Sequence, residues 1–244
     1  MKKIIIALLI GFTMSVQAQE TVKLRFNYTP GDVYVMTVKT ASAMLPVMST
    51  EITVAMEMEI LGKENENFLT QSRFSRIIMN TMQNGTSMNY DSSKSDDELD
   101  QNGKLVKAQM EPMMQAVINA TVNPLGENLK LMVVPTDAAR AGDFANQNGM
   151  TYPEKALAVG DTWSATKNSN GMTMNSTYTL KQIDDEVITV DVSGKASGMA
   201  EGKVSGYVFI DRASGVPTES KIIVEIDVMG KTVKTEAIVT MEKQ

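Results

Sequence analysis

The side chains that most often do chemistry in proteins are scarce in this chain. It has no histidine and no cysteine, the usual ligands of zinc and copper, and histidine is also the commonest general base. The 29 acidic residues are spread along the chain, and no spacing selects the two carboxylates that glycoside hydrolysis requires. We therefore expect no catalytic residues and no cofactor, and a carboxylate-based hydrolase is the least favoured of three functions that the sequence allows.

One short motif matches a known nucleophile. Ser164 and Lys167 have the spacing of the Ser-x-x-Lys motif of penicillin-recognising acyl enzymes. That chemistry needs the serine on a helix, together with Ser-Asp-Asn and Lys-Thr-Gly elements, and neither element occurs here. Because the motif also falls in a segment that alternates like a strand, we interpret it as a chance match.

An acidic loop over residues 91–102 resembles the start of a calcium site. Glu98, Asp100 and Asn102 have the right spacing, but the twelfth position, which should be a bidentate acid, is Gln109. We prefer a solvated acidic loop to a calcium site.

Methionine is unusually common, with 20 residues, while aromatic residues make up only 5% of the chain. Paired thioethers attract Cu(I), which is a soft ion. Most of the pairs fall on the apolar face of a predicted strand or helix, so we interpret them as core or cavity lining and expect no bound metal. The pairs are Met56/Met58, Met113/Met114 and Met172/Met174.

Residues 1–18 are typical of a secretory signal peptide. Lys2 and Lys3 precede a short apolar run, and small residues at Val16 and Ala18 suit cleavage before residue 19. The run is too short for a bilayer span, which needs roughly 20 residues, and the chain lacks the cysteine that a lipid anchor requires. We expect an exported protein, periplasmic or secreted, with no transmembrane anchor after cleavage.

The net charge disfavours two classes of partner. The chain carries −6, and cleavage of the signal would remove two lysines and no acid. Nucleic acids and anionic membrane surfaces both favour basic patches. We therefore expect no nucleic-acid partner.

Period-two alternation dominates the rest of the chain. Apolar and polar residues alternate over 22–28, 52–60, 222–228 and 233–241. One apolar and one polar face per strand is typical of antiparallel sheets. We predict an α+β, β-dominated fold with a curved, mostly antiparallel sheet of about eleven strands, five before residue 92 and six after residue 160.

The strands fall into two similar blocks, 21–91 and 160–243, within one domain covering 19–244. The similarity predicts two related curved half-sheets rather than two domains. Three segments of the first block recur in the second: 31–34 in 160–163, 50–54 in 176–180 and 66–70 in 185–189.

A helical insert, residues 104–147, separates the blocks. Apolar spacing from Lys104 to Ala120 predicts a helix, which either kinks or begins at Pro112. A strand over 129–134 and a short helix over 137–146 follow. The apolar stripe of the first helix is Val106, Met110, Met113, Met114, Val117 and Ile118.

Two further features concern shape. Glycines at 194, 198, 202 and 206 recur on one face of the second block, where they permit sharp bending of a sheet. The hairpin loop over 43–48 is almost wholly apolar, although exposed loops rarely are. Its side chains Met44, Leu45, Val47 and Met48 either fold back over the core or contact a ligand, lipid or partner.

Several motifs together resemble an uncharacterised exported bacterial family, domain of unknown function 6263. The motifs are the Gly-Asp-x-aromatic turns at 31–34 and 160–163, Asn-Tyr-Asp-Ser at 89–92, and Tyr-Pro-Glu-Lys at 152–155. The resemblance covers most of the mature chain, and it implies no established activity and no catalytic residues.

A curved sheet with a methionine-rich helix on its concave side is similar to half-barrel envelope proteins that carry lipid tails. The leading hypothesis is non-catalytic binding of a hydrophobic ligand, or of an acylated or unfolded envelope protein, in a Met-lined cavity. The alternative is a structural or assembly protein with a solid core. The predicted ligand contacts are the loop residues Met44, Leu45, Val47 and Met48 and the helical stripe Val106, Met110, Met113, Met114, Val117 and Ile118.

Overall fold

The computed structural model describes residues 20–244, except 45–46, 137, 170, 199 and 229. The predicted signal peptide and Leu45 of the apolar loop therefore lie outside the described residues.

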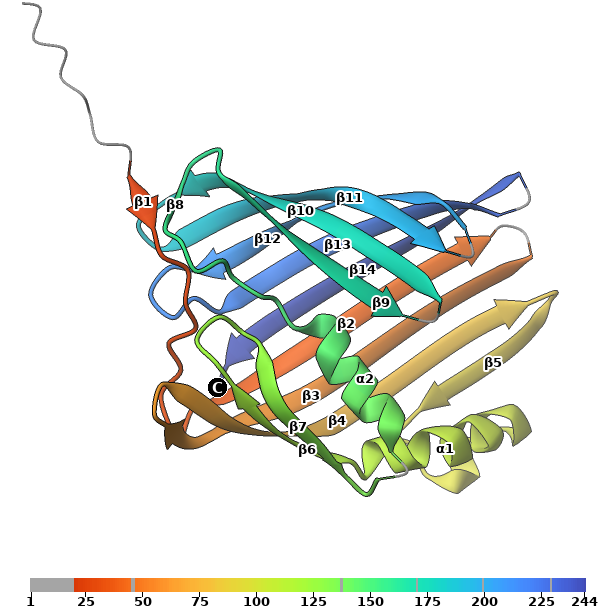
Figure 1. Ribbon diagram of the computed structural model, residues 1–244. Coiled ribbons are helices and arrows are strands. Elements are labelled where there is room, and N and C mark those ends of the chain that lie inside the picture. The colour runs from red at the N-terminus through yellow and green to blue at the C-terminus, as the bar shows by residue number, and fades with distance from the viewer. Residues whose placement is uncertain (1–19, 45–46, 137, 170, 199, 229) are drawn as a thin grey trace, which may run out of the picture.

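The described chain is dominated by one curved antiparallel sheet of twelve strands (Figure 1). Its order is β7-β6-β4-β3-β2-β14-β13-β12-β11-β10-β9, with β5 also paired to β4. The edge strands β7 and β9 are not paired with each other among the described residues, so the sheet is a half-barrel. This confirms the predicted fold class. The strands are β2 (Val33–Met44), β3 (Met48–Glu64), β4 (Asn67–Gln83), β5 (Thr86–Asp91), β6 (Val117–Val122), β7 (Asn128–Val134), β9 (Thr162–Ser169), β10 (Met172–Ile183), β11 (Val187–Gly198), β12 (Gly202–Asp211), β13 (Pro217–Val228) and β14 (Lys231–Lys243).

The two strand blocks open with the same hydrogen-bonded turn. In the first, the N–H of Gly31 donates to the carbonyl of Ile60 at 2.7 Å. In the second, the N–H of Gly160 donates to the carbonyl of Leu180 at the same distance, 2.7 Å. Both glycines have a positive φ, which favours glycine over residues with a side chain. The turns support an internal duplication. They make Ile60 the counterpart of Leu180, whereas the sequence match of 50–54 with 176–180 makes Val54 its counterpart. A slip by an even number of residues keeps the apolar face, so alternation alone cannot detect it.

The first predicted strand, over residues 22–28, is wrong. Only β1 (Thr21–Val22) is a strand there, paired with β8 (Leu157–Ala158) outside the large sheet. The next residues keep the alternation of buried and exposed side chains, but the backbone N–H of Phe26 donates to the carbonyl of Pro124, in a loop, at 2.9 Å. The segment therefore crosses one end of the half-barrel rather than extending its sheet.

Aromatic side chains close this end of the half-barrel and form an end plug. Tyr28 contacts the rings of Phe26, Tyr34 and Phe68, each with ring centroids 5.3 Å apart, and Phe26 also lies 5.0 Å from Tyr152. All five side chains are buried. The hydroxyl of Tyr152 donates to the carbonyl of Gly215 at 2.7 Å, so its polar atom is paired inside the plug.

The prediction of a helical insert is partly correct. Helix α1 (Gln101–Met114) begins where the Asp100 carboxylate accepts the N–H of Gly103 at 2.7 Å, and Pro112 lies in its last turn rather than at its start. The chain then becomes β6, so the predicted helix is wrong at Val117 and Ile118, which pair with β4. Short apolar runs fit both periods, and pairing with an available strand decides between them. Strand β7 and helix α2 (Ala139–Asn148) confirm the predicted strand and short helix.

The glycine repeat lies where strands of the second half approach closely. A Cβ on Gly194 would stand 2.2 Å from the carbonyl oxygen of Asn175, and one on Gly206 would stand 1.9 Å from that of Lys221. No side chain fits in either place. The bent second half of the sheet therefore depends on glycine at these positions.

Candidate functional site

The concave face of the sheet borders a partly open cavity of about 680 Å³. Because side chains alternate along each strand, one face of every long strand in the middle of the sheet points into it. Across the sheet, Ile222, Ala237, Thr40, Ile52 and Met79 follow one another in register and all line the cavity. The opposite wall comes from the two helices of the insert.

The lining is mostly apolar and rich in flexible side chains. Neutral polar groups, among them Thr70 and Ser72, interrupt it, and Lys167 is the one charged residue among the described lining residues. Thioether side chains adapt to irregular shapes because they have three rotatable bonds and are unbranched. Nine methionines line the cavity: Met36, Met56, Met58, Met79, Met110, Met113, Met150, Met174 and Met241.

Helix α2 bridges the gap between the two edge strands (Figure 1). On the β7 side, the amide of Asn128 donates to the side-chain oxygen of Asn146 in α2 at 3.0 Å. On the β9 side, the Nζ of Lys167 donates to the carbonyl of Gly149, directly after α2, at 2.6 Å. The helix therefore acts as a cover over the opening of the half-barrel.

Apolar contacts hold α2 against the sheet as well. Phe144 of α2 packs edge-on against Phe74 of β4, with ring centroids 5.5 Å apart. A Cβ on Gly142 would lie 3.1 Å from Val133 and 3.3 Å from Leu131 of β7, so the helix backbone rests directly on that strand. Only a small residue allows so close a contact.

Lys167 lies at the margin of the cavity, half-buried on β9. Burial lowers the pKa of its ammonium group, because desolvation disfavours the charged form. Ser164 lies on the other face of the same strand, since an odd number of positions separates the two residues. The Ser-x-x-Lys match is thus in a strand, as predicted, and its two side chains do not meet.

The helical stripe is only partly in the cavity. Met110, Met113 and Ile118 line it. Val106 and Met114 do not line it. All five pack in or against a core cluster around Phe74, Ile77 and Tyr90. Val117 is half-buried on β6 and does not line the cavity.

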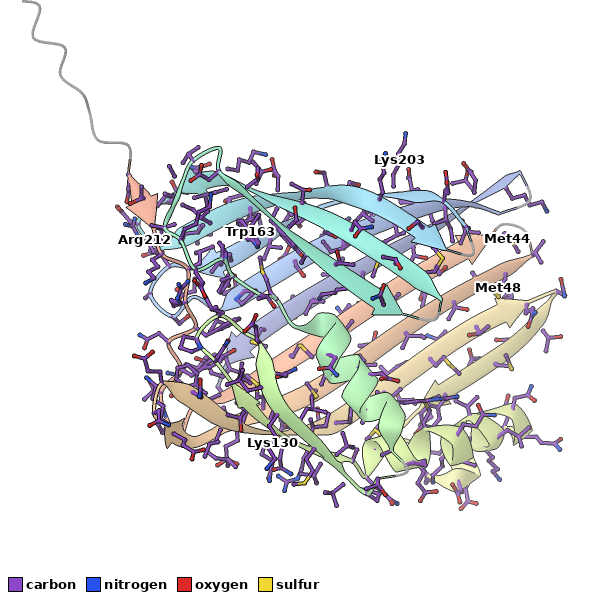
Figure 2. The ribbon with its side chains drawn as sticks, viewed as in Figure 1. Met44, Met48, Lys130, Trp163, Lys203 and Arg212 are labelled. Atoms are coloured by element: carbon purple, nitrogen blue, oxygen red, sulfur yellow. The ribbon has the colours of Figure 1, made fainter. Side chains whose placement is uncertain are left out.

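The apolar loop lies at the tip of the β2–β3 hairpin, at the far end from the end plug (Figure 2). Met44 and Met48 are paired across the hairpin, and the N–H of Val47 donates to the carbonyl of Met44 at 2.9 Å. None of the three side chains lines the cavity or joins a buried core cluster. The prediction that this loop folds back over the core is wrong for its described residues, while contact with a partner stays a prediction.

Sequence reasoning missed most of the cavity wall, which comes from strands rather than from the insert. Residues such as Ile52, Met56, Ala237 and Met241 belong to the apolar faces predicted over 52–60 and 233–241. Alternation identified that face, but it gave no sign that the face borders a hollow rather than a packed core.

The acidic side chains of residues 91–102 make local hydrogen bonds and ion pairs. Glu98 accepts both the N–H and the hydroxyl of Ser95, at 2.9 and 2.8 Å. Asp91 pairs with Arg76 at 2.8 Å, and the hydrogen bond from that guanidinium holds the pKa of Asp91 well below its usual range. Within the described ranges, no three acidic side chains gather where they could hold a metal ion.

Comparison with known proteins gives a match to one family model over part of the chain and one similar fold. Residues 142–233 match the model described as Family of unknown function (DUF6263), which confirms over that segment the resemblance seen in the sequence. No curated protein matches the chain. A solved structure titled "Lipid-protein interactions in lipovitellin" is similar in fold, with a TM-score of 0.54 and 10% identity. The similarity covers 89% of this chain and 25% of the lipovitellin chain, so the present chain spans about a quarter of that protein.

No helix among the described residues combines the length and apolar character needed to cross a membrane.

Proposed function

We propose that the protein binds a hydrophobic ligand of lipid type in the concave cavity and does so without catalysis. The observation that carries this proposal is the hollow itself, which is about 680 Å³ in volume and lined by aliphatic side chains and nine methionines. Ligand pockets in proteins usually measure roughly 300–1,000 Å³ and are lined mainly by apolar groups. The cavity has the size and chemistry of such a pocket.

Two further observations support a lipid rather than a compact ligand. The lining extends along one concave face from β7 to β9, which suits an elongated, flexible molecule. The fold is also similar to part of lipovitellin, whose structure is titled for its lipid–protein interactions. At 10% identity this likeness concerns the fold alone. It supports a lipid ligand only in combination with the apolar lining of the cavity.

The rival hypothesis, a structural protein with a solid core, leaves the hollow unexplained. Packed interiors contain few voids larger than a water molecule. The core cluster around the end plug is packed in this way, with Ile60, Leu180 and Ile188 fully buried. One packed cluster therefore lies at this end and a second surrounds Phe74, Ile77 and Tyr90. The cavity that remains along the concave face is free to take a ligand.

We also propose that the protein functions outside the cytoplasm, because residues 1–18 are typical of a secretory signal peptide. In that compartment a soluble carrier would shield an acyl chain from water. An acylated envelope protein could present the same chain, so the cavity suits either source.

Native mass spectrometry of protein purified from its own envelope tests the proposal. We expect an added mass of lipid size, removed by organic extraction. Ala237→Phe would place a ring in the hollow, opposite Ile222 and Thr40, and should abolish the added mass without lowering the urea midpoint. Ala41→Phe is the matched control, because Ala41 is exposed on the convex face of β2.

Retention of the added mass by Ala237→Phe would place the ligand elsewhere. The absence of any added mass in the wild type, together with no uptake of a fluorescent fatty acid by the extracted protein, would refute the proposal.

A further inference from the structure

A second hollow, which we call the end pocket, lies at the end of the half-barrel that the aromatic plug closes. It measures about 430 Å³, within the usual size range of ligand pockets, roughly 300–1,000 Å³. The chain that crosses this end separates the end pocket from the hydrophobic cavity. Phe26 and Tyr28 line the cavity. The alternate residues Asn27 and Thr29 line the end pocket, and Met241 borders both hollows.

The end pocket is polar, in contrast to the cavity. Its charged groups are the carboxylates of Asp32 and Asp211 and the ammonium of Lys243. The Nζ of Lys243 lies 2.8 Å from the carboxylate of Asp32, so these two charges neutralise each other. Val216 and Met241 supply apolar surface. The other polar lining residues are Asn27, Thr29, Tyr34, Ser214 and Thr218.

Asp211 gives the end pocket one net negative charge. Its Oδ1 accepts the N–H of Ser214 at 2.8 Å and the hydroxyl of the same residue. In the part of the chain that the structure describes, Asp211 has no ion-pair partner. Its neighbour Arg212, labelled at this end in Figure 2, pairs instead with Glu20 at 2.7 Å. The end pocket therefore lacks one positive charge.

The internal duplication shows that the carboxylate of Asp32 does not serve its turn. The counterpart of Asp32 in the second block is Asp161, whose Oδ2 accepts the N–H of Ala158 at 2.9 Å and closes the turn. Asp32 makes no such bond among the described residues. Its carboxylate lies instead between Lys243 and the hydroxyl of Tyr34, which donates to it at 3.5 Å. One copy of the motif thus stabilises a turn, and the other presents its acid to a pocket.

The hydroxyl of Tyr34 senses both acids of the end pocket. Burial raises the pKa of Tyr34 to about 12, together with the charge of Asp32, the hydrogen bond to it and the charge of Asp211. The two carboxylates therefore lie close enough to act on one group between them.

A pocket with a net negative charge, neutral hydroxyls and some apolar surface suits a small cation. We propose that the end pocket is a second binding site, for a compact molecule with a primary ammonium group, and that the carboxylates of Asp211 and Asp32 receive this group. An ammonium has three donors, which can be shared between the two carboxylates and a neighbouring hydroxyl. The site is separate from the hydrophobic cavity, and the proposal does not depend on lipid binding.

Titration with three small probes tests this proposal. Ethanolamine, ethylene glycol and glycolate share a two-carbon frame and differ in charge, and ligand-observed NMR measures their binding. Phosphate buffer at pH 7 is used, because Tris is itself a primary amine. We expect the wild type to bind ethanolamine roughly tenfold more tightly than ethylene glycol, since hydrogen bonds to a charged group are stronger than neutral ones. Glycolate should bind most weakly.

Two variants should change the affinity for ethanolamine in opposite directions. Asp211→Asn keeps the shape of the side chain and removes its charge, so it should weaken binding of ethanolamine roughly tenfold and leave ethylene glycol unchanged. Lys243→Met removes the ammonium that competes for Asp32, so it should tighten binding of ethanolamine severalfold. Damage to the fold would weaken binding in both variants, so it cannot produce opposite signs.

Asp161→Asn is the matched control. Asp161 has the place of Asp32 in the second turn and lines neither hollow. This variant should bind all three probes as the wild type does.

The possible failures are distinct. If the wild type binds ethanolamine no more tightly than ethylene glycol, the proposal is refuted. If Asp161→Asn weakens ethanolamine as much as Asp211→Asn does, the effect comes from overall charge and the end pocket is not the site. If Lys243→Met weakens ethanolamine, Asp32 does not receive the ammonium group, and the proposal is overturned. None of these results bears on lipid binding in the cavity.

Discussion

Two isoleucines on β3 provide a direct test of whether the half-barrel is hollow. Ile52 and Ile60 lie on the same face of the same strand, and Ile→Ala removes the same three carbons from each. Ile60 is 0% exposed beside the end plug, whereas Ile52 is half-buried in the cavity wall. Any difference between the two variants therefore reports the surroundings and not the chemistry of the substitution.

The expected losses of stability differ by about 2–3 kcal/mol. Ile60→Ala leaves a void in a packed cluster and should cost roughly 3–4 kcal/mol, within the usual range for such changes. Ile52→Ala only widens an existing hollow, so the loss reduces to the transfer of partly buried carbons, about 1 kcal/mol at ~0.8 kcal/mol per fully buried CH₂.

Urea unfolding of lipid-extracted protein measures the difference. With a slope of about 2 kcal/mol per molar urea, the two midpoints should lie roughly 1–1.5 M apart. Extraction matters, because a bound ligand would fill the space above Ile52 and raise the stability of the native state. Equal losses of stability at the two sites, with unchanged slopes, would mean that the space above Ile52 is packed, and the cavity argument would fail.

Four further predictions follow from the sequence and the site. Mature protein should begin at Gln19, which N-terminal sequencing of the exported form checks; retention of residues 1–18 in a membrane fraction would contradict it. Elemental analysis should find no stoichiometric metal, and about one copper per chain would reverse that expectation. Met110→Asp should cost only about 1–2 kcal/mol, since its carboxylate can reach water in the cavity, while fatty-acid binding collapses; a loss of several kcal/mol with binding intact would contradict this. Asp91→Asn should lower the urea midpoint at pH 7, because the pKa of Asp91 is held down by Arg76 in the folded state. That stabilisation is present above the ordinary carboxyl pKa of about 4 and is lost as the pH falls through the folded value, so the variant and the wild type should converge in acid.

Much of the fold could be predicted from the sequence because period two is a local property. A residue's face in a strand depends only on its position relative to its neighbours, so the alternating segments 52–60, 222–228 and 233–241 lie in strands as predicted. The segment around Phe26 shows the limit of this reasoning. Its alternation predicted buried and exposed side chains correctly, but the backbone partner is a loop carbonyl and not a strand.

Ile118 shows a second limit. The apolar spacing around it fits a helix and a strand, and the local preference is too weak to decide. Pairing with Ser72 of β4, which is far away in the sequence, supplies the hydrogen bonds that make the strand. Such long-range pairing cannot be seen in a window of neighbouring residues.

The candidate site depended most on tertiary structure. The sequence by itself determined that the chain has no histidine or cysteine chemistry, that its strands have one apolar face, and that methionine replaces aromatic residues on many of them. Only the curvature of the sheet decided that these faces surround a hollow, and only the approach of α2 to β9 placed Lys167 at its margin. The physical reason is that an apolar face looks the same in sequence whether it meets another packed face or an open space. Volume is a property of how the elements are arranged, and no single element carries it.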